Sequence, residues 1–351
     1  MARRLSLLSA FIGFLFVLSG CGLFGPDDTP SNGAIDPPPL HSQPAASGEK
    51  VDAPADASSQ KKDKPAASTH KVYVLDTEGL VVPWEVELPK SEGMAKKVLG
   101  YMVQGGESEK ILPPGFRAVL PKGTKILGMT IKEGVATVDF SPEFKKYKAE
   151  DEQKILEALT WTLTEFSGVK EVNIWINGHP QEIMPVKGTP VSHMSRENGI
   201  NVEVSDRVKP GQAMAVTLYF QNQVSDKLTY FVPVTRWIPK TDNKELAVVQ
   251  ELIQGPHTGS PLFSALLPTM NVKSVKQQKD IIVVNFDNKI LSYNQGQANP
   301  DALESVVLSL TENSKAKKVQ IMVDGKNTVK AGGIDYTKPV TRSMVTESRA
   351  Y

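Results

Sequence analysis

The chain has little cysteine, little net charge and no long apolar run beyond its first residues. Its 351 residues include one cysteine, so an intrachain disulfide is excluded and the fold must rest on its core. The formal net charge is +1, which argues against an electrostatic nucleic-acid binder, so we expect no nucleic-acid partner. After the amino-terminal segment, no stretch of the sequence is long and apolar enough to cross a membrane, since a spanning helix needs about 20 residues.

Residues that usually carry catalysis or metal binding are also scarce. The histidines of the expected folded part are His179, His193 and His257, and none lies in a metal-binding spacing such as HExxH. No serine has the GxSxG context of a nucleophile elbow, and the paired glycines do not form a phosphate-binding loop. We therefore expect solvated surface histidines, no metal, no cofactor and no catalytic residue.

The amino terminus has the layout of a signal peptide. Arg3 and Arg4 precede a nearly apolar run of about 14 residues, which suits a signal peptide and is too short to span a bilayer. The run ends in the sequence LSGC, which resembles the lipobox of bacterial lipoproteins. That resemblance implies removal of residues 1–20 and lipidation of Cys21 with a diacylglycerol, whose two acyl chains give stable anchoring. We therefore predict a protein anchored by lipid to the extracytoplasmic face of the cell membrane.

Residues 21–70 are predicted to form a disordered tether. They are rich in proline, alanine, serine and glycine and contain few large apolar side chains. Such a segment cannot bury enough apolar surface to offset the conformational entropy lost on folding.

The remaining sequence repeats itself at long range. The segment LTEFSGVKEVNIWING at 163–178 returns as LTENSKAKKVQIMVDG at 310–325, and ATVDFS at 136–141 returns as IVVNFD at 282–287. Solenoid repeats run roughly 20 to 50 residues, so a period of 146 or 147 residues indicates a duplicated domain.

We predict a first domain over 71–197, a short polar linker over 198–213 and a second domain over 214–347. Both repeats have the predicted order β-β-α-β-β-α-β. A hairpin between two helices favours an α+β fold, with a small mixed sheet in each repeat and helices on one face, over a doubly wound parallel sheet. Apolar spacing predicts helices at 92–104, 150–166, 244–254 and 301–313. It predicts strands at 71–76, 84–88, 125–131, 135–140 and 172–176, and again at 216–220, 228–234, 272–277, 281–286 and 319–323.

Glutamates recur at equivalent helix positions in the two repeats. Glu157 and Glu165 correspond to Glu304 and Glu312. Paired carboxylates are able to run a hydrolytic reaction. The eight-residue spacing on a helix suits a surface stripe or a helix-end contact, so we favour a structural role. The tryptophans, for which we expect packing rather than carbohydrate stacking, are Trp84, Trp161, Trp175 and Trp237.

The repeated motifs resemble those of the GerMN domain, and the resemblance spans nearly all of the expected folded residues. The second repeat has Asn285 where the first has Asp139, and Asp287 where the first has Ser141, which weakens a role for Asp139 as an acid or base. The motifs that carry the resemblance in the first repeat are Gly105-Gly106, Leu120-Pro121, Val138-Asp139-Phe140-Ser141 and Leu163-Thr164-Glu165.

Tandem GerMN domains behind a lipoprotein signal are typical of a family of sporulation and spore-germination lipoproteins of endospore-forming bacteria. The resemblance implies modules similar to the ring-building modules of the channel that joins mother cell and forespore. It also implies a place in the mother-cell membrane around the forespore, and a non-enzymatic role in assembling or localising that channel complex, whose proteins would be the partners. The extracytoplasmic location and the repeated glutamates leave an alternative, a peptidoglycan-binding or peptidoglycan-modifying spore envelope protein. A solute-binding lipoprotein is disfavoured because such proteins carry doubly wound domains.

Overall fold

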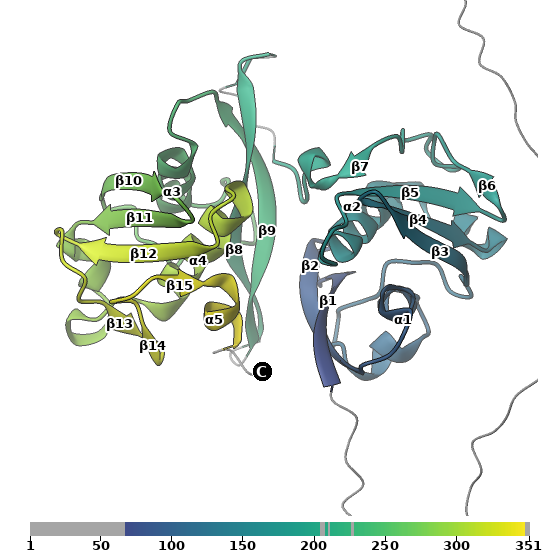
Figure 1. The fold of residues 1–351 in the computed structure, drawn as a ribbon, viewed down its shortest axis with the longest axis horizontal. Coiled ribbons are helices and arrows are strands. Elements are labelled where there is room, and N and C mark those ends of the chain that lie inside the picture. The colour runs from purple at the N-terminus through teal and green to yellow at the C-terminus, as the bar shows by residue number, and fades with distance from the viewer. Residues whose placement is uncertain (1–66, 204–207, 210, 226–227, 348–351) are drawn as a thin grey trace, which may run out of the picture. The chain divides into compact units, whose positions relative to one another are not determined.

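A computed structural model describes residues 67–203, 208–209, 211–225 and 228–347 (Figure 1). The predicted signal peptide, most of the predicted tether and Cys21 lie outside these residues. Among the described residues, no helix combines the length and the apolar character needed to span a membrane. The first strand begins at Ala67, inside the segment predicted to be tether. The domain boundaries drawn from the sequence stay predictions.

The first repeat has the predicted order β-β-α-β-β-α-β, which confirms the α+β class. Its main elements are β1 (Ala67–Leu75), β2 (Val81–Pro89), α1 (Met94–Gly100), β3 (Ile126–Lys132), β4 (Val135–Phe140), α2 (Glu152–Leu163) and β5 (Glu171–Ile176). Its short 3-10 helices are η1 (Glu107–Lys110), η2 (Pro142–Lys145), η3 (Ala149–Asp151) and η4 (Arg196–Asn198). Two short strands, β6 (His179–Pro180) and β7 (Met194–Ser195), pair with β5.

The second repeat has the same order. Its main elements are β8 (Ala213–Ser225), β9 (Leu228–Pro239), α3 (Lys244–Gln254), β10 (Val272–Gln278), β11 (Ile281–Phe286), α4 (Pro300–Asn313) and β12 (Lys318–Val323). The smaller elements are η5 (Asn288–Leu291), η6 (Asn294–Gly296), β13 (Lys330–Ala331), β14 (Ile334–Asp335), β15 (Val340–Thr341) and α5 (Arg342–Glu347).

Each repeat divides its main strands between two sheets, where the sequence predicts one. In the first repeat, β1 and β2 form a separate antiparallel ribbon, and β3-β4-β5 form a mixed sheet in which β4 and β5 run parallel. In the second repeat, β8 and β9 form the ribbon and β10-β11-β12 form the mixed sheet. The helices lie between the two sheets, because α2 contacts both β1 and β5, and α4 contacts both β8 and β12.

Alternating burial explains how the mixed sheets pack against the helices. In β4 the side chains of Ala136, Val138 and Phe140 are fully buried and the residues between them are partly exposed. The burial pattern of β11 is the same, with Ile282, Val284 and Phe286 inside. One face of each sheet therefore forms a core with the helices, as the period-two pattern in the sequence predicts.

The helix ends follow local chemistry. The side chains of Asn243 and Asn299 accept backbone N–H bonds at the starts of α3 and α4, and Pro300 occupies the first turn of α4. Helix α1 is shorter than predicted, because the chain turns after residue 100 so that the backbone N–H of Gln104 bonds to the carbonyl of Leu120. Gly105 then has a φ of 75°, which glycine adopts without strain.

Candidate functional site

A tyrosine, a glutamate and an arginine meet at the end of α2 in the first repeat. The Nη2 atom of Arg196 lies 2.5 Å from Oε1 of Glu165, and the hydroxyl of Tyr73 donates to the same oxygen at 3.4 Å. The guanidinium of Arg196 lies 4.4 Å from the centre of the Trp161 ring, at a distance typical of a cation–π contact. Arg196 begins η4, whose preceding residue Ser195 caps it, so its backbone is held locally.

The second repeat contains the same set at the equivalent positions. Arg342 Nη1 lies 3.0 Å from Oε2 of Glu312, and the hydroxyl of Tyr219 donates to that oxygen at 3.1 Å. Arg342 Nη2 also donates to the Tyr219 hydroxyl. The tyrosine, glutamate and arginine are each repeated after 146 or 147 residues. A matching pair of backbone contacts supports the equivalence, because a hydroxyl of the helix accepts the tyrosine N–H in both repeats, at 2.9 Å each.

Arg196 joins the two sets. Its Nη1 atom lies 2.7 Å from Oε1 of Glu312, so an arginine of the first repeat binds a glutamate of the second. Glu312 is bound by Arg196 and Arg342 at once, and 10% of its side-chain surface is exposed. Charge-assisted contacts with so little exposure are screened far less than surface pairs.

The pKa shifts in this cluster favour ion pairing and hydrogen bonding between its members. Burial would raise the pKa of Glu312, but the charges of Arg196 and Arg342 outweigh it and hold that pKa below its ordinary value. Burial, reinforced by nearby carboxylates, raises the pKa of Tyr73 and Tyr219. Glu312 is therefore held as an ionised carboxylate, beside neutral phenols that donate hydrogen bonds to the glutamates.

Further polar contacts connect the two repeats. Asp76, at the end of β1, accepts hydrogen bonds from Asn222 at 3.2 Å and from the Tyr230 hydroxyl at 2.8 Å. Asn201, in the predicted linker, bonds to both backbone groups of Val81 at 2.9 and 2.8 Å and donates to the carbonyl of Pro233 at 2.8 Å. The linker is thus part of the structure that connects β2 and β9.

The other repeated glutamates correct one prediction. A surface stripe is wrong for Glu157, whose exposure is 7%, and for Glu304, whose exposure is 5%. Glu157 accepts the backbone N–H of Asn201 at 3.1 Å, and burial raises its pKa. Glu165, by contrast, makes the helix-end contact that the spacing allows.

Asp139 has a structural partner in place of a catalytic one. Its carboxylate accepts the backbone N–H of Gly178 at 3.0 Å, and the side chain of Asn285 accepts that of Gly325 at 2.9 Å. Aspartate and asparagine have the same role here, because the side-chain oxygen of each accepts a backbone N–H in the turn that follows β5 or β12.

The remaining candidates from the sequence do not come together. His179, His193 and His257 are exposed, and no group of histidine, cysteine and acidic side chains within the described ranges is placed to hold a metal ion. Trp161 is fully buried and Trp84 packs on Phe116, whereas 38% of Trp175 and 37% of Trp237 are exposed. The sequence did not single out the tyrosines and arginines of the cluster, although the repeat offset that paired the glutamates also pairs them.

A further buried carboxylate holds a loop. Glu152, at the start of α2, accepts backbone N–H bonds from Lys187 at 2.7 Å and from Thr189 at 3.0 Å, and a hydroxyl bond from Tyr147 at 2.8 Å. Burial would raise the pKa of Glu152, but these hydrogen bonds lower it to about 2. Its role is to fix the loop over 186–189 to the helix.

Comparison with known proteins gives consistent matches. The family described as "Germane: Sporulation and spore germination" matches residues 71–182 and 217–329, more than half of the chain. The chain is 38% identical over 342 residues to the spore germination protein GerM of Bacillus subtilis (strain 168), with 93% of each protein covered.

Solved structures match as well. The tandem GerMN domains of the sporulation protein GerM from Bacillus subtilis match with a TM-score of 0.74 and 38% identity, covering 79% of this chain and 97% of that one. The first GerMN domain of the same protein is 52% identical, with 37% of this chain and 98% of that chain covered and a TM-score of 0.36.

Proposed function

Because the chain belongs to the Germane family of sporulation and spore-germination proteins, we propose that it acts there as a non-enzymatic, lipid-anchored assembly protein. In this proposal it helps to assemble or localise the complex that joins mother cell and forespore. Proteins of that complex are its partners, and its place is the extracytoplasmic face of the mother-cell membrane around the forespore.

The observation that carries the proposal is the set of contacts that the repeated glutamates make. Glu165 and Glu312 are the residues that a duplicated hydrolytic site would use, and both are bound to arginine. Glu312 accepts bonds from two guanidinium groups and a phenol, which leaves it ionised and committed to its partners. A carboxylate held in this way stabilises structure and is a poor general acid.

The bridge by Arg196 supports a role in assembly. It connects the two repeats through a contact that is mostly withdrawn from solvent, and Asn201 and Asp76 add uncharged and charged contacts beside it. Contacts between the two repeats reduce the ordering that binding a partner would otherwise require, which favours specific association with other proteins.

The anchor completes the proposal. A diacylglycerol on Cys21 and a tether that ends before β1 would keep the repeats close to the membrane while leaving them free to reach a partner. Anchoring raises the effective concentration of the repeats at that surface, so weak contacts with membrane-bound partners would suffice.

A crosslinking pull-down from sporulating cells tests this function. The lipidated chain is compared with the Cys21→Ala variant, and the proteins recovered are identified by mass spectrometry. We expect proteins of the mother cell–forespore complex with the lipidated chain and a marked loss of them with the variant. Recovery of peptidoglycan fragments alone, with digestion of peptidoglycan that Glu165→Gln abolishes, would contradict the proposal and establish the wall-active alternative.

A further inference from the structure

The two repeats meet through equivalent parts of themselves. Asp76 and Asn222 occupy equivalent positions 146 residues apart and are hydrogen-bonded to each other at 3.2 Å. Strands β2 and β9, which are also equivalent, contact each other. When a surface meets its own equivalent, each contact has a reciprocal contact. The reciprocal of the Arg196–Glu312 pair is a pair between Arg342 and Glu165.

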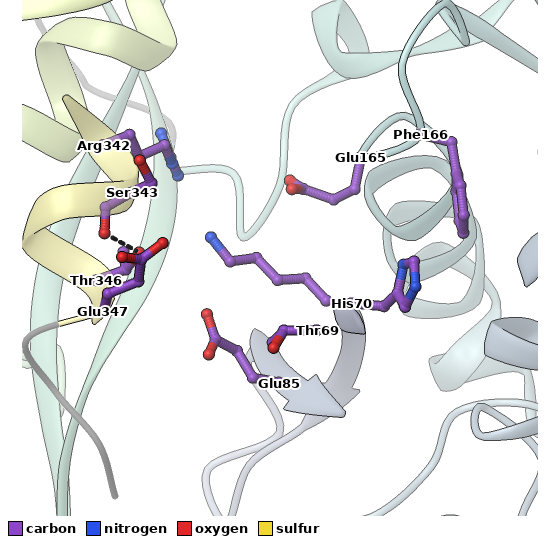
Figure 2. Close-up of a pocket in the computed structure, with 10 residues that line it drawn as sticks. Thr69, His70, Glu85, Glu165, Phe166, Arg342, Ser343, Thr346 and Glu347 are labelled. Atoms are coloured by element: carbon purple, nitrogen blue, oxygen red, sulfur yellow. Dashed lines mark hydrogen bonds between the residues drawn. The ribbon is translucent and has the colours of Figure 1, made fainter. Parts of the chain in front are cut away.

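Arg342 and Glu165 do not form this reciprocal pair. Within the described part of the chain, Arg342 and Glu165 share no hydrogen bond or ion pair, whereas Arg196 and Glu312 lie 2.7 Å apart. A cavity of about 430 Å³ lies between them instead, and Figure 2 shows the side chains of Glu85 and Glu165 pointing into the same space. The cavity is thus the place where the symmetry of the repeats is broken.

The cavity lining combines both charges. Lys71 and Arg342 contribute cations, Glu85, Glu165 and Glu347 contribute carboxylates, and Ser343 is one of the hydroxyl-bearing residues beside them. These side chains come from β1, β2, the end of α2 and α5, so both repeats build the lining. The cavity volume of about 430 Å³ lies within the range of small-molecule sites.

Lys71 is the cation of the lining that lacks an ion-pair partner among the described residues. It is half-buried, and no acceptor lies within hydrogen-bond or ion-pair distance of its ammonium group among the residues described. Burial lowers the pKa of Lys71, and the charge of Arg342 lowers it further, although Glu165 and Glu85 act in the opposite direction. An anion placed between Lys71 and Arg342 would relieve both effects.

We propose that this cavity binds the zwitterionic ends of an amino acid or short peptide. The ligand carboxylate lies between Lys71 and Arg342, and the ligand ammonium faces Glu85 and Glu347. Such a ligand matches both charges of the lining, whereas a simple anion would face carboxylates and a simple cation would face Lys71.

Calorimetric titration of the whole lipidated chain in detergent tests the site. The probe is L-alanyl-L-alanine, with N-acetyl-L-alanine lacking the ammonium and L-alaninamide lacking the carboxylate. We expect saturable binding of the dipeptide. Either analogue should bind at least about tenfold more weakly, because losing one charge-assisted hydrogen bond lowers the affinity by roughly tenfold or more. A soluble peptidoglycan stem peptide forms a further arm. If it competes with the dipeptide, the cell wall is the source of the ligand, and if it does not, a free small molecule is.

The variants are Lys71→Met and Glu85→Gln, each of which removes one charge from the lining. We expect either change to weaken dipeptide binding about tenfold. Lys97→Met, an exposed lysine of α1, is the matched control and should bind like the parent chain. Glu85 is exposed, so its variant keeps the test decisive even if Lys71→Met folds poorly. Absence of saturable dipeptide binding, or unchanged affinity in both variants, would overturn the proposal.

Discussion

Glu312 and Glu165 are equivalent by duplication, yet their surroundings predict different contributions to stability. Glu312 binds Arg196 at 2.7 Å and Arg342 at 3.0 Å, and its side chain is 10% exposed. Glu165 binds Arg196 at 2.5 Å, and its side chain is 27% exposed. We therefore expect Glu312→Gln to destabilise the protein much more than Glu165→Gln.

The magnitudes follow from the charges that each change leaves behind. Without the Glu312 carboxylate, Arg342 keeps contacts only with Tyr219 and the carbonyl of Leu308 among its described hydrogen-bond partners. An unpaired charge of this kind costs about 3–5 kcal/mol, and we expect about 3 because glutamine keeps one acceptor oxygen. After Glu165→Gln, Arg196 still has Glu312, so the loss is that of a partly exposed pair, about 1 kcal/mol or less.

Urea unfolding of the whole chain and both variants at pH 7 measures the two free energies of unfolding. The Arg196→Gln variant and its double variant with Glu312→Gln complete a double-mutant cycle, for which we expect a coupling of about 1 to 3 kcal/mol. Equal losses for the two glutamates, or a coupling near zero, would refute the conclusion that Arg196 binds the repeats together through Glu312. Raising the salt concentration should reduce the Glu165 contribution more than the Glu312 contribution, because exposed pairs are screened more.

Other contacts give further tests of stability by urea unfolding. Glu152→Gln should lower the free energy of unfolding by about 3 kcal/mol at pH 7, since its pKa is about 2 in the folded state against an ordinary 4.5. A depressed folded pKa stabilises above the unfolded value, so this contribution should be lost as the pH falls from about 4.5 to about 2, and a variant with unchanged acid unfolding would contradict it. Asp139→Asn should change stability by less than about 0.5 kcal/mol, because Asn285 does the same work in the second repeat, whereas Asp139→Ala should cost about 1 kcal/mol and speed amide exchange at Gly178. Asn201→Ala should cost about 2 kcal/mol or more, because it leaves backbone groups on both β2 and β9 without their partner, and a loss below about 0.5 kcal/mol would show that water replaces the side chain.

Amphipathic spacing and duplication predict most of the fold. Helix α3 and strands β4 and β11 have the predicted bounds, because their apolar patterns are clear and glycine or turn residues end them. The separation of each ribbon from its mixed sheet was not predictable in this way. Periodicity tells which face of a strand is buried, but the identity of the hydrogen-bonded neighbour depends on contacts between distant segments.

The candidate site was visible only in part. The repeat offset identified Glu165 and Glu312 as equivalent, but neither lies in a motif that names an arginine as its partner. Arg196 and Arg342 follow the last main strand of their repeats, in segments where the sequence similarity is weak. The burial of Glu157 was not predictable for a related reason. Helical spacing tells which face of α2 carries Glu157, but it does not tell that the linker residue Asn201 packs against that face.

One difference between the repeats explains why Arg196 pairs with Glu312 whereas Arg342 does not pair with Glu165 among the described contacts. Arg196 lies over the ring of Trp161, whereas the position equivalent to Trp161 is Leu308, which has no aromatic face. Arg342 lies over the ring of Tyr219 instead, 4.7 Å from its centre, and donates to the hydroxyl of that same residue. An arginine held by its own tyrosine does not complete the reciprocal bridge to Glu165. The two equivalent surfaces therefore differ: one contains the ion pair between Arg196 and Glu312, and the other lines the charged cavity.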